Sequence, residues 1–202
     1  MVELRVRLFN QLTMILCIVI IMLKGRGNMN KSINKMCVTA MGIALFVVLS
    51  YCVQVPVFEN YYLCFGYVAM TVFCYYYGPI SGMTVGVFGV FLYCLLISGL
   101  HGMPGWAIGN IVIGFIVGFT CKITSKMKKQ KLRHFFIGIS IVFSVAIGMI
   151  GAKSIVETLL YAQPIILRVG KNLYAFVADV IVMLISLPIC VSLKKVMPKY
   201  FE

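Results

Sequence analysis

The sequence predicts an all-α membrane protein: one bundle of six transmembrane helices with both termini in the cytoplasm. Of its 202 residues, 62% are hydrophobic and only 11% are charged, whereas charged residues make up about 25% of a typical soluble domain. The mean hydropathy is +1.03. A soluble domain of this length has one core, which cannot bury so much apolar surface. The composition therefore excludes a soluble enzyme, a disordered chain and a secreted disulfide scaffold.

Six apolar runs account for the predicted helices, because a membrane helix needs about 20 apolar residues, or slightly fewer when it is tilted or borders a cavity. The first run ends at Pro56, and Gly78-Pro79 forms a tight turn between the second and the third. The segment 99–105 separates the third from the fourth, and a basic cluster precedes the fifth. The runs cover residues 35–55, 61–77, 80–100, 105–121, 135–153 and 171–193.

The basic residues predict the orientation. Lys and Arg number 18 against five Asp and Glu, which gives a formal net charge of +13. The opposite side from the termini would carry Lys153, Arg168, Lys171, Glu59 and Glu157. The side with the termini would carry Lys24, Arg26, Lys31, Lys35, Lys122, Lys126, Lys128, Lys129, Lys131, Arg133, Lys194, Lys195 and Lys199. Cations in short gaps between apolar runs are typical of a cytoplasmic membrane face and not of a nucleic-acid-binding surface.

The first 28 residues do not fit this plan. Their apolar segment, 12–23, is short for a span, and no small-residue cleavage site follows it. Residues 24–27 (Lys-Gly-Arg-Gly) follow instead. We therefore expect residues 1–28 to be an extension upstream of the true start at Met29, and residues 29–202 to form the six-helix domain. The intact mass of the native protein tests this expectation.

No constellation of catalytic or metal-binding residues is visible. The five Asp and Glu are scattered, which leaves no acid–base pair. The eight cysteines form no Cys-x-x-Cys motif and no Cys/His cluster, so no metal site, redox motif or cofactor is expected. Segment 148–154 (GMIGAKS) has Ala152 where a phosphate-binding loop needs its second glycine. The sequence thus predicts a protein that is not an enzyme and has no means of its own to use ATP.

Polar residues within the apolar runs are the candidate site. An ionised Asp179 in the last run is costly unless it is paired or hydrated. Asn172 and Arg168, seven and eleven residues earlier, lie close to the same helix face. Trp106 and Asn110 are one turn apart at the start of the fourth run. These residues form either a small-ligand site or a hydrogen-bond network between the fourth and sixth helices.

Aromatic and small residues complete the expectations. Trp106 fits an interfacial aromatic belt as well as a ligand site, and Tyr67 is expected as a belt or packing residue. The glycines of the third and fourth runs predict close packing between helices. Ala40 and Ala44, one turn apart on the first run, fit either internal packing or a face that meets a partner.

Six short apolar helices, the Ala40-x-x-x-Ala44 pair and the Tyr-Gly-Pro-Ile-Ser-Gly turn at 77–82 resemble the substrate-binding S components of energy-coupling factor (ECF) transporters. The turn is similar to the F/Y-G-P-x-x-G segment of that family. Residues 104–110 (Pro-Gly-Trp-Ala-Ile-Gly-Asn) look like the start of its fourth helix. The resemblance covers about residues 29–195.

The resemblance implies a binding subunit for a vitamin or related micronutrient in the bacterial plasma membrane. The ligand would lie among the outer halves of helices four to six, with the loop 55–62 as its gate. The protein would dock through Ala40 and Ala44 on a membrane scaffold, the T component, which is coupled to two ATP-binding cassette subunits. Arg168 and Lys171 favour an anionic solute and Asp179 opposes one, so an amphoteric solute is expected.

Two other classes of function stay open. A non-transport assembly or regulatory protein would use the basic loop to bind anionic lipid or a partner. A membrane-embedded enzyme would need a converging pair such as Glu157 with His101. A secondary transporter fits less well, because no inverted repeat or pair of broken helices is visible.

Overall fold

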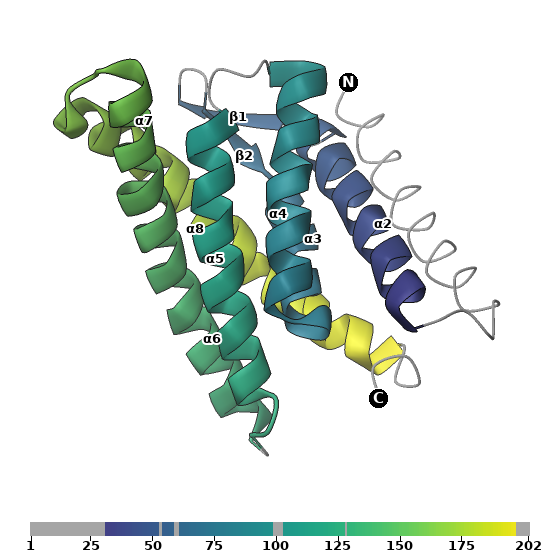
Figure 1. The fold of residues 1–202 in the computed structure, drawn as a ribbon. Helices are drawn as coiled ribbons and strands as arrows, with labels where there is room; N and C mark the ends of the chain where they lie inside the picture. The colour runs from purple at the N-terminus through teal and green to yellow at the C-terminus, as the bar shows by residue number, and fades with distance from the viewer. Residues whose placement is uncertain (1–30, 53, 59–60, 99–102, 128, 197–202) are drawn as a thin grey trace.

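The computed structural model describes residues 31–52, 54–58, 61–98, 103–127 and 129–196. The predicted extension 1–28 and the predicted start at Met29 lie outside these ranges. Within them the chain forms a helical bundle (Figure 1). Its elements are α2 (Lys31–Cys52), β1 (Gln54–Phe58), β2 (Tyr61–Cys64), α3 (Gly66–Tyr77), α4 (Pro79–Tyr93), the π-helical η1 (Cys94–Ser98), α5 (Met103–Thr124), α6 (Gln130–Val145), the π-helical η3 (Ala146–Lys153), α7 (Ser154–Tyr161) and α8 (Ile165–Val196).

The prediction of a six-helix membrane bundle is confirmed. α4 continues into η1, and α6, η3 and α7 form one uninterrupted helix, so six helical rods make up the described part of the bundle. Five of them are long and apolar enough to cross a membrane: Lys35–Cys52, Pro79–Leu96, Met103–Thr124, Gln130–Tyr161 and Ile165–Leu193. The sixth, α3, has only 12 residues.

The second predicted span, 61–77, divides into a strand and a helix. β2 pairs with β1 in an antiparallel hairpin, with Val55 opposite Leu63 and Pro56 opposite Tyr62. Aromatic and β-branched residues in these segments favour strands, and an edge strand tolerates Pro56. The 12 residues of α3 extend about 18 Å, less than a bilayer core of about 30 Å. α3 is therefore a short helix held inside the bundle.

The fifth and sixth predicted spans are longer than expected. The run predicted at 135–153 extends over Gln130–Tyr161, and that predicted at 171–193 extends over Ile165–Val196. Lys153 was expected at the outer end of the fifth run and Glu157 in the connection that follows, but both lie inside the first of these helices. Being four residues apart, they form an ion pair along the helix, which reduces the free-energy cost of burying both charges.

The two ends of the bundle differ, and we name them by their contents. The hairpin end carries β1 and β2, the start of α5 and the connection from α7 to α8 (Figure 1). The basic end carries the start of α2, the α3–α4 turn, the α5–α6 connection and the end of α8. This alternation is the one expected for helices that cross a membrane up and down.

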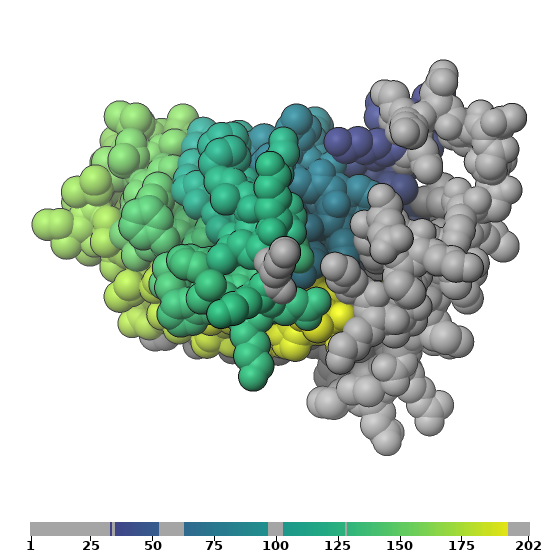
Figure 2. Space-filling view, turned by 90° about the horizontal axis from the view of Figure 1, so that it is seen from below, coloured from purple at the N-terminus to yellow at the C-terminus, as the bar shows by residue number. Residues whose placement is uncertain are grey.

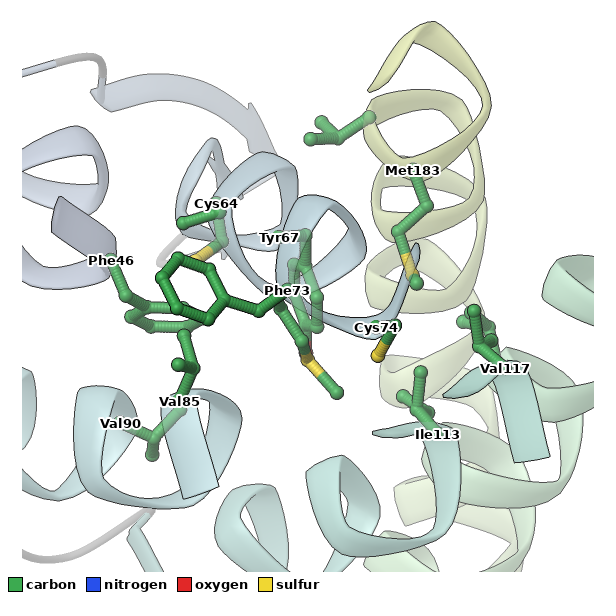
Figure 3. Close-up of a cluster of buried hydrophobic side chains, with 14 of the residues drawn as sticks. Phe46, Cys64, Tyr67, Phe73, Cys74, Val85, Val90, Ile113, Val117 and Met183 are labelled. Atoms are coloured by element: carbon green, nitrogen blue, oxygen red, sulfur yellow. The ribbon is translucent and has the colours of Figure 1, made fainter. Parts of the chain in front are cut away.

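The core lies between α3 and its neighbours. Phe46, Tyr67, Val85, Ile113 and Met183, from five different helices, are all fully buried there (Figure 3). α3 contacts α2, α4, α5 and α8, which explains how so short a helix is held at the centre.

Glycines bring helix backbones together, as predicted. A Cβ on Gly114 would lie 2.9 Å from Met83 Cα, and one on Gly109 would lie 3.0 Å from the Gly148 carbonyl oxygen. α5 therefore approaches α4 on one side and η3 on the other so closely that a side chain at these positions would displace backbone.

On α2 the small residues divide between two faces. Gly42 faces inward, because a Cβ there would clash with the rings and methyl groups of Phe73 and Val85. Ala40 and Ala44 are exposed, as is Met36 on the same side of the helix. The described residues thus leave the Ala40/Ala44 face uncovered.

Candidate functional site

Four charged or polar side chains meet around Glu157 near the hairpin end. Arg168 Nη1 lies 3.6 Å from Glu157 Oε2, and Lys153 Nζ lies 4.0 Å from Glu157 Oε1. Asn172 Nδ2 donates hydrogen bonds to Glu157 Oε2 at 3.2 Å and to Ser154 Oγ at 2.9 Å. We call these five residues, from η3, α7 and α8, the Glu157 cluster.

The Glu157 cluster is buried. Glu157 is 4% exposed, Lys153 is 9% exposed, and Asn172 and Ser154 are inaccessible. Removing charges from water is costly unless each finds an opposite charge and hydrogen bonds. Glu157 supplies the opposite charge to Lys153 and Arg168, and Asn172 donates a hydrogen bond to its carboxylate. Arg168 Nε and Asn172 Oδ1, however, are buried and have no hydrogen-bond partner among the described residues.

A second polar group is built on Tyr67, the buried tyrosine of α3. Trp106 Nε1 donates to Tyr67 Oη at 2.8 Å, and Tyr67 donates to Asn110 Oδ1 at 2.8 Å. Asn110 Nδ2 donates to the Gly86 carbonyl at 3.0 Å. This Tyr67 network joins α3, α4 and α5 by side-chain hydrogen bonds.

Asp179 of α8 connects the two groups. It is 4% exposed, and it interacts electrostatically with Lys153 of the Glu157 cluster and with the Tyr67 hydroxyl. A tyrosine hydroxyl has one proton to donate, and here two acceptors, Asn110 Oδ1 and the Asp179 carboxyl, lie beside it. We call the Glu157 cluster, Asp179 and the Tyr67 network together the buried polar tract, which extends from α7 to α5.

Local backbone features position this tract. η3 is π-helical, a geometry that is rare and occurs often at functional sites, and it runs directly into Lys153 and Ser154. Gly105 lets the first turn of α5 approach α7, because a Cβ there would lie 2.8 Å from Glu157 Cγ. The hairpin also contacts α8, the helix that carries Asp179.

The structure brings together all five residues predicted from the sequence. Arg168 and Asn172 lie in the Glu157 cluster, Trp106 and Asn110 in the Tyr67 network, and Asp179 between them. Asn110 of α5 and Asn172 of α8 form no direct hydrogen bond that the structure describes. Tyr67, Asp179 and Lys153 lie between them in the buried polar tract.

Four residues of the site were missed. Tyr67 was expected in a belt or in packing, but it is buried and bonded to two polar side chains. Lys153 was expected only as the outer end of the fifth run, Glu157 only in the connection and as the partner of His101 in an enzyme, and Ser154 was given no part in the site. The spacing of Lys153 and Glu157, four residues apart next to an apolar run, was the available signal. No signal in the sequence distinguished Tyr67, because the chain has ten other tyrosines, most of them in or beside apolar runs.

The remaining expectations are placed as follows. His101 lies outside the described residues, and Glu157, its suggested partner in an enzyme, is occupied by Lys153, Arg168 and Asn172. The loop 55–62 belongs largely to the β1–β2 hairpin. Within the ranges that the structure describes, no three His, Cys, Asp or Glu side chains converge so that they could hold a metal ion.

Two bacterial relatives match part of the chain. A UPF0397 protein of Lactococcus lactis subsp. cremoris (strain SK11) is 30% identical over 104 residues, 50% of this chain and 54% of the relative. The chain thus spans about half of that relative's length. A UPF0397 protein of Aliivibrio salmonicida is 29% identical over 140 residues, 67% of this chain and 76% of the relative.

The fold matches a solved membrane protein. The crystal structure of the S-component for biotin from an ECF-type ABC transporter superposes on 88% of this chain and 100% of that chain, with a TM-score of 0.60. The sequence identity is 18%, so the match shows a shared fold.

The family model described as the ECF-type riboflavin transporter, S component, matches residues 30–195. That range covers every helix of the bundle except the last residue of α8. Together with the fold and the apolar spans, this match shows a membrane protein of a transporter family and not of an enzyme family. The chain belongs to the S components of ECF-type riboflavin transporters.

Proposed function

We propose that this protein binds a micronutrient of the vitamin class on the outer side of a bacterial plasma membrane, as the substrate-binding subunit of an ATP-driven importer. The observation that carries the proposal is the buried polar tract near the hairpin end of an S-component fold. Buried ionisable residues inside a membrane protein are expensive and mark substrate pathways. Trp106, Asn110, Arg168, Asn172 and Asp179 are the proposed binding residues, joined by Tyr67, Lys153 and Glu157.

The charges of the site favour an uncharged polar solute. The sequence predicted an amphoteric solute, because Arg168 and Lys171 favour an anion and Asp179 opposes one. However, Glu157 pairs with Arg168, and Lys171 is exposed. A solute that carries a hydrogen-bond donor would pair with Asn172 Oδ1, the acceptor without a partner. Riboflavin, named in the family's description, is therefore the first candidate, and biotin, the ligand named for the solved relative in fold, is the second.

The proposed transport cycle places the hairpin end outside and both termini in the cytoplasm. The β1–β2 hairpin, which contacts α8, would act as the gate over the solute. The exposed Ala40/Ala44 face would dock on the T component, because small residues let helix backbones approach in lipid. Two ATP-binding cassette subunits would supply the energy.

Mass spectrometry of the purified full-length protein tests the ligand. We expect a retained small molecule, and binding of riboflavin in titration calorimetry in preference to biotin. Asn172→Ala should weaken binding by about tenfold or more, since a buried hydrogen bond is lost. Ser186→Ala is the matched control: Ser186 is equally buried on α8 but bonds only to the backbone of its own helix.

Ligand binding that is equal in the two variants would remove these residues from the site. A protein that retains no molecule and binds no vitamin of a broad panel would overturn the proposal and favour a non-transport role.

Uptake of the bound vitamin by vesicles that contain the complete transporter tests docking. Ala40→Leu/Ala44→Leu should abolish uptake and leave binding by the isolated subunit unchanged, because both side chains are exposed and distant from the tract. Val142→Leu on the exposed face of α6 is the control. Normal uptake by the double variant would show that another face docks.

A further inference from the structure

A second buried charge lies at the basic end, far from the proposed vitamin site. Arg133, in the first turn of α6, is 8% exposed, and its guanidinium carbon lies 4.3 Å from the centre of the Tyr75 ring. Its Nε is buried and has no hydrogen-bond partner among the described residues. A guanidinium taken out of water in this way normally pairs with an anion.

No carboxylate in the described part of the chain lies near Arg133. The five acids of the sequence include two that the structure describes, Glu157 and Asp179, and both belong to the tract at the hairpin end. The groups that face Arg133 from the neighbouring helices are the ring of Tyr75, with His134 stacked on it, and the thiols Cys121 and Cys190. Arg133 thus has aromatic and sulfur neighbours but no described counter-ion.

The start of α6 adds further positive charge. Lys129 precedes the helix without a side-chain cap, no acid lies in its first turn, and Lys129 and Lys131 are exposed. The amino end of a helix carries a partial positive charge, so cations there repel it and an anion is stabilised by its free N–H groups. Lys129 and Arg133, four residues apart, lie on nearly the same side of this uncapped amino end, and Arg133 is buried, whereas Lys131 lies on the opposite side of the helix.

Exposed apolar side chains near these cations indicate that the anion belongs to a lipid. Leu132, Phe135 and Phe136, on the same turns of α6, are 42%, 64% and 44% exposed. α6 contacts α5 and α8, whereas α2 contacts α3 and α4. The two helices therefore lie on opposite flanks (Figure 1), and docking through α2 would leave α6 facing lipid. Figure 2, seen from the basic end, shows the green atoms of this region reaching out beside the yellow end of α8.

We propose that Arg133 and Lys129 bind the phosphate of an anionic phospholipid whose acyl chains lie along Leu132 and Phe136, the exposed apolar side chains that flank Arg133 on α6. The head group would use the guanidinium and the free N–H groups of α6, and the chains would cover its exposed apolar face. Basic sites between helices at a membrane boundary recognise phospholipid head groups in this way. The site is independent of what binds at the hairpin end.

Native mass spectrometry of the full chain tests the site, with phosphatidylglycerol and phosphatidylcholine offered in equal amounts. We expect the wild type to retain phosphatidylglycerol selectively. Arg133→Gln should lower that retention by about tenfold or more, as expected for loss of a charged hydrogen-bond donor. The matched control Lys126→Gln removes one exposed positive charge from the same end and should lower retention by about fivefold or less.

Four results would overturn the proposal. The first is no preference for phosphatidylglycerol, and the second is an equal loss in both variants, which would indicate a diffuse charge effect. In the third, inorganic phosphate displaces the lipid, so that the ligand is a soluble anion. In the fourth, Arg133→Gln abolishes assembly with the transporter's other subunits and leaves lipid retention unchanged. If Arg133→Gln does not fold, Arg133→Lys is the second test, because it keeps the positive charge but lacks the planar guanidinium group. Phosphatidylglycerol retention equal to that of the wild type in Arg133→Lys would also reject the site.

Discussion

The two ends of the bundle contain buried cations in opposite electrostatic settings. At the hairpin end, the two cations Lys153 and Arg168 lie with two carboxyl groups: both pair with Glu157, and Lys153 also interacts with Asp179. At the basic end, Arg133 lies on the Tyr75 ring with no acidic partner among the described residues. The first arrangement leaves Asn172 Oδ1 and Arg168 Nε without a described hydrogen-bond partner but gives its cations a carboxylate, whereas the second has no described carboxylate, which is why we propose an anion from outside the chain.

This difference in charge compensation predicts two kinds of ligand selection. A site whose charges already compensate each other selects a solute by hydrogen bonds and shape, because a further charge would be left without a partner. A site with uncompensated cations selects by charge and is weakened by salt. The hairpin end therefore suits a small uncharged solute, and the basic end suits an anionic head group.

Glu157→Gln should produce the largest loss of stability. It leaves Lys153 and Arg168 without their carboxylate, and breaking a buried ion pair costs about 3–5 kcal/mol. Thermal unfolding of the purified protein in detergent should show a clearly lower midpoint. Glu157→Asp keeps the charge and should lose less. An unfolding midpoint like that of the wild type would mean that the cluster is solvated and the contrast between the two ends is false.

Tyr67→Phe should have an intermediate effect. The change removes the acceptor of the Trp106 N–H and the donor to Asn110 Oδ1, and each buried group left without a partner costs about 1–3 kcal/mol. The measurement is again the unfolding midpoint, together with vitamin affinity. Tyr51→Phe on α2, where the side chain is 61% exposed, is the control and should change neither. Equal results for both tyrosines would show that the Tyr67 network has no energetic role.

Lys126→Gln/Lys129→Gln should have the smallest effect. Both side chains are exposed and form no ion pair that the structure describes, and surface substitutions of this kind change stability by within about 0.5 kcal/mol. Unfolding in uncharged detergent should therefore match the wild type. A loss as large as that of Tyr67→Phe would mean that charges at the basic end are compensated within the chain, contrary to the difference described above.

Much of this structure could be predicted from particular residues. Gly78-Pro79 predicted the turn between α3 and α4, and the glycines of α5 predicted its close contacts with α4 and η3. The stripe of Arg168, Asn172 and Asp179 predicted a buried polar face on α8, because helical periodicity places the three residues on one side. Trp106 and Asn110 were predicted as a pair for the same reason.

Other features depended on contacts between distant segments. From the sequence, Tyr61–Cys64 was predicted as part of an apolar helix. Only its pairing with Gln54–Phe58 in the structure shows that it is a strand. Nothing in the sequence distinguishes Tyr67 from the other tyrosines. Its burial and hydrogen bonds follow from the position of α3 between α4, α5 and α8.

The sequence by itself determined that lipid surrounds this protein, approximately where its helices lie, and the polar face of α8, since hydropathy and helical period are local properties. Tertiary structure alone decided which polar groups compensate each other: Glu157 meets Arg168 and Asn172 across the α7–α8 connection, whereas Arg133 lies against the Tyr75 ring with no carboxylate near it among the described residues. The free energy of a buried charge depends on its neighbours in space, and the order of residues along a chain does not specify them.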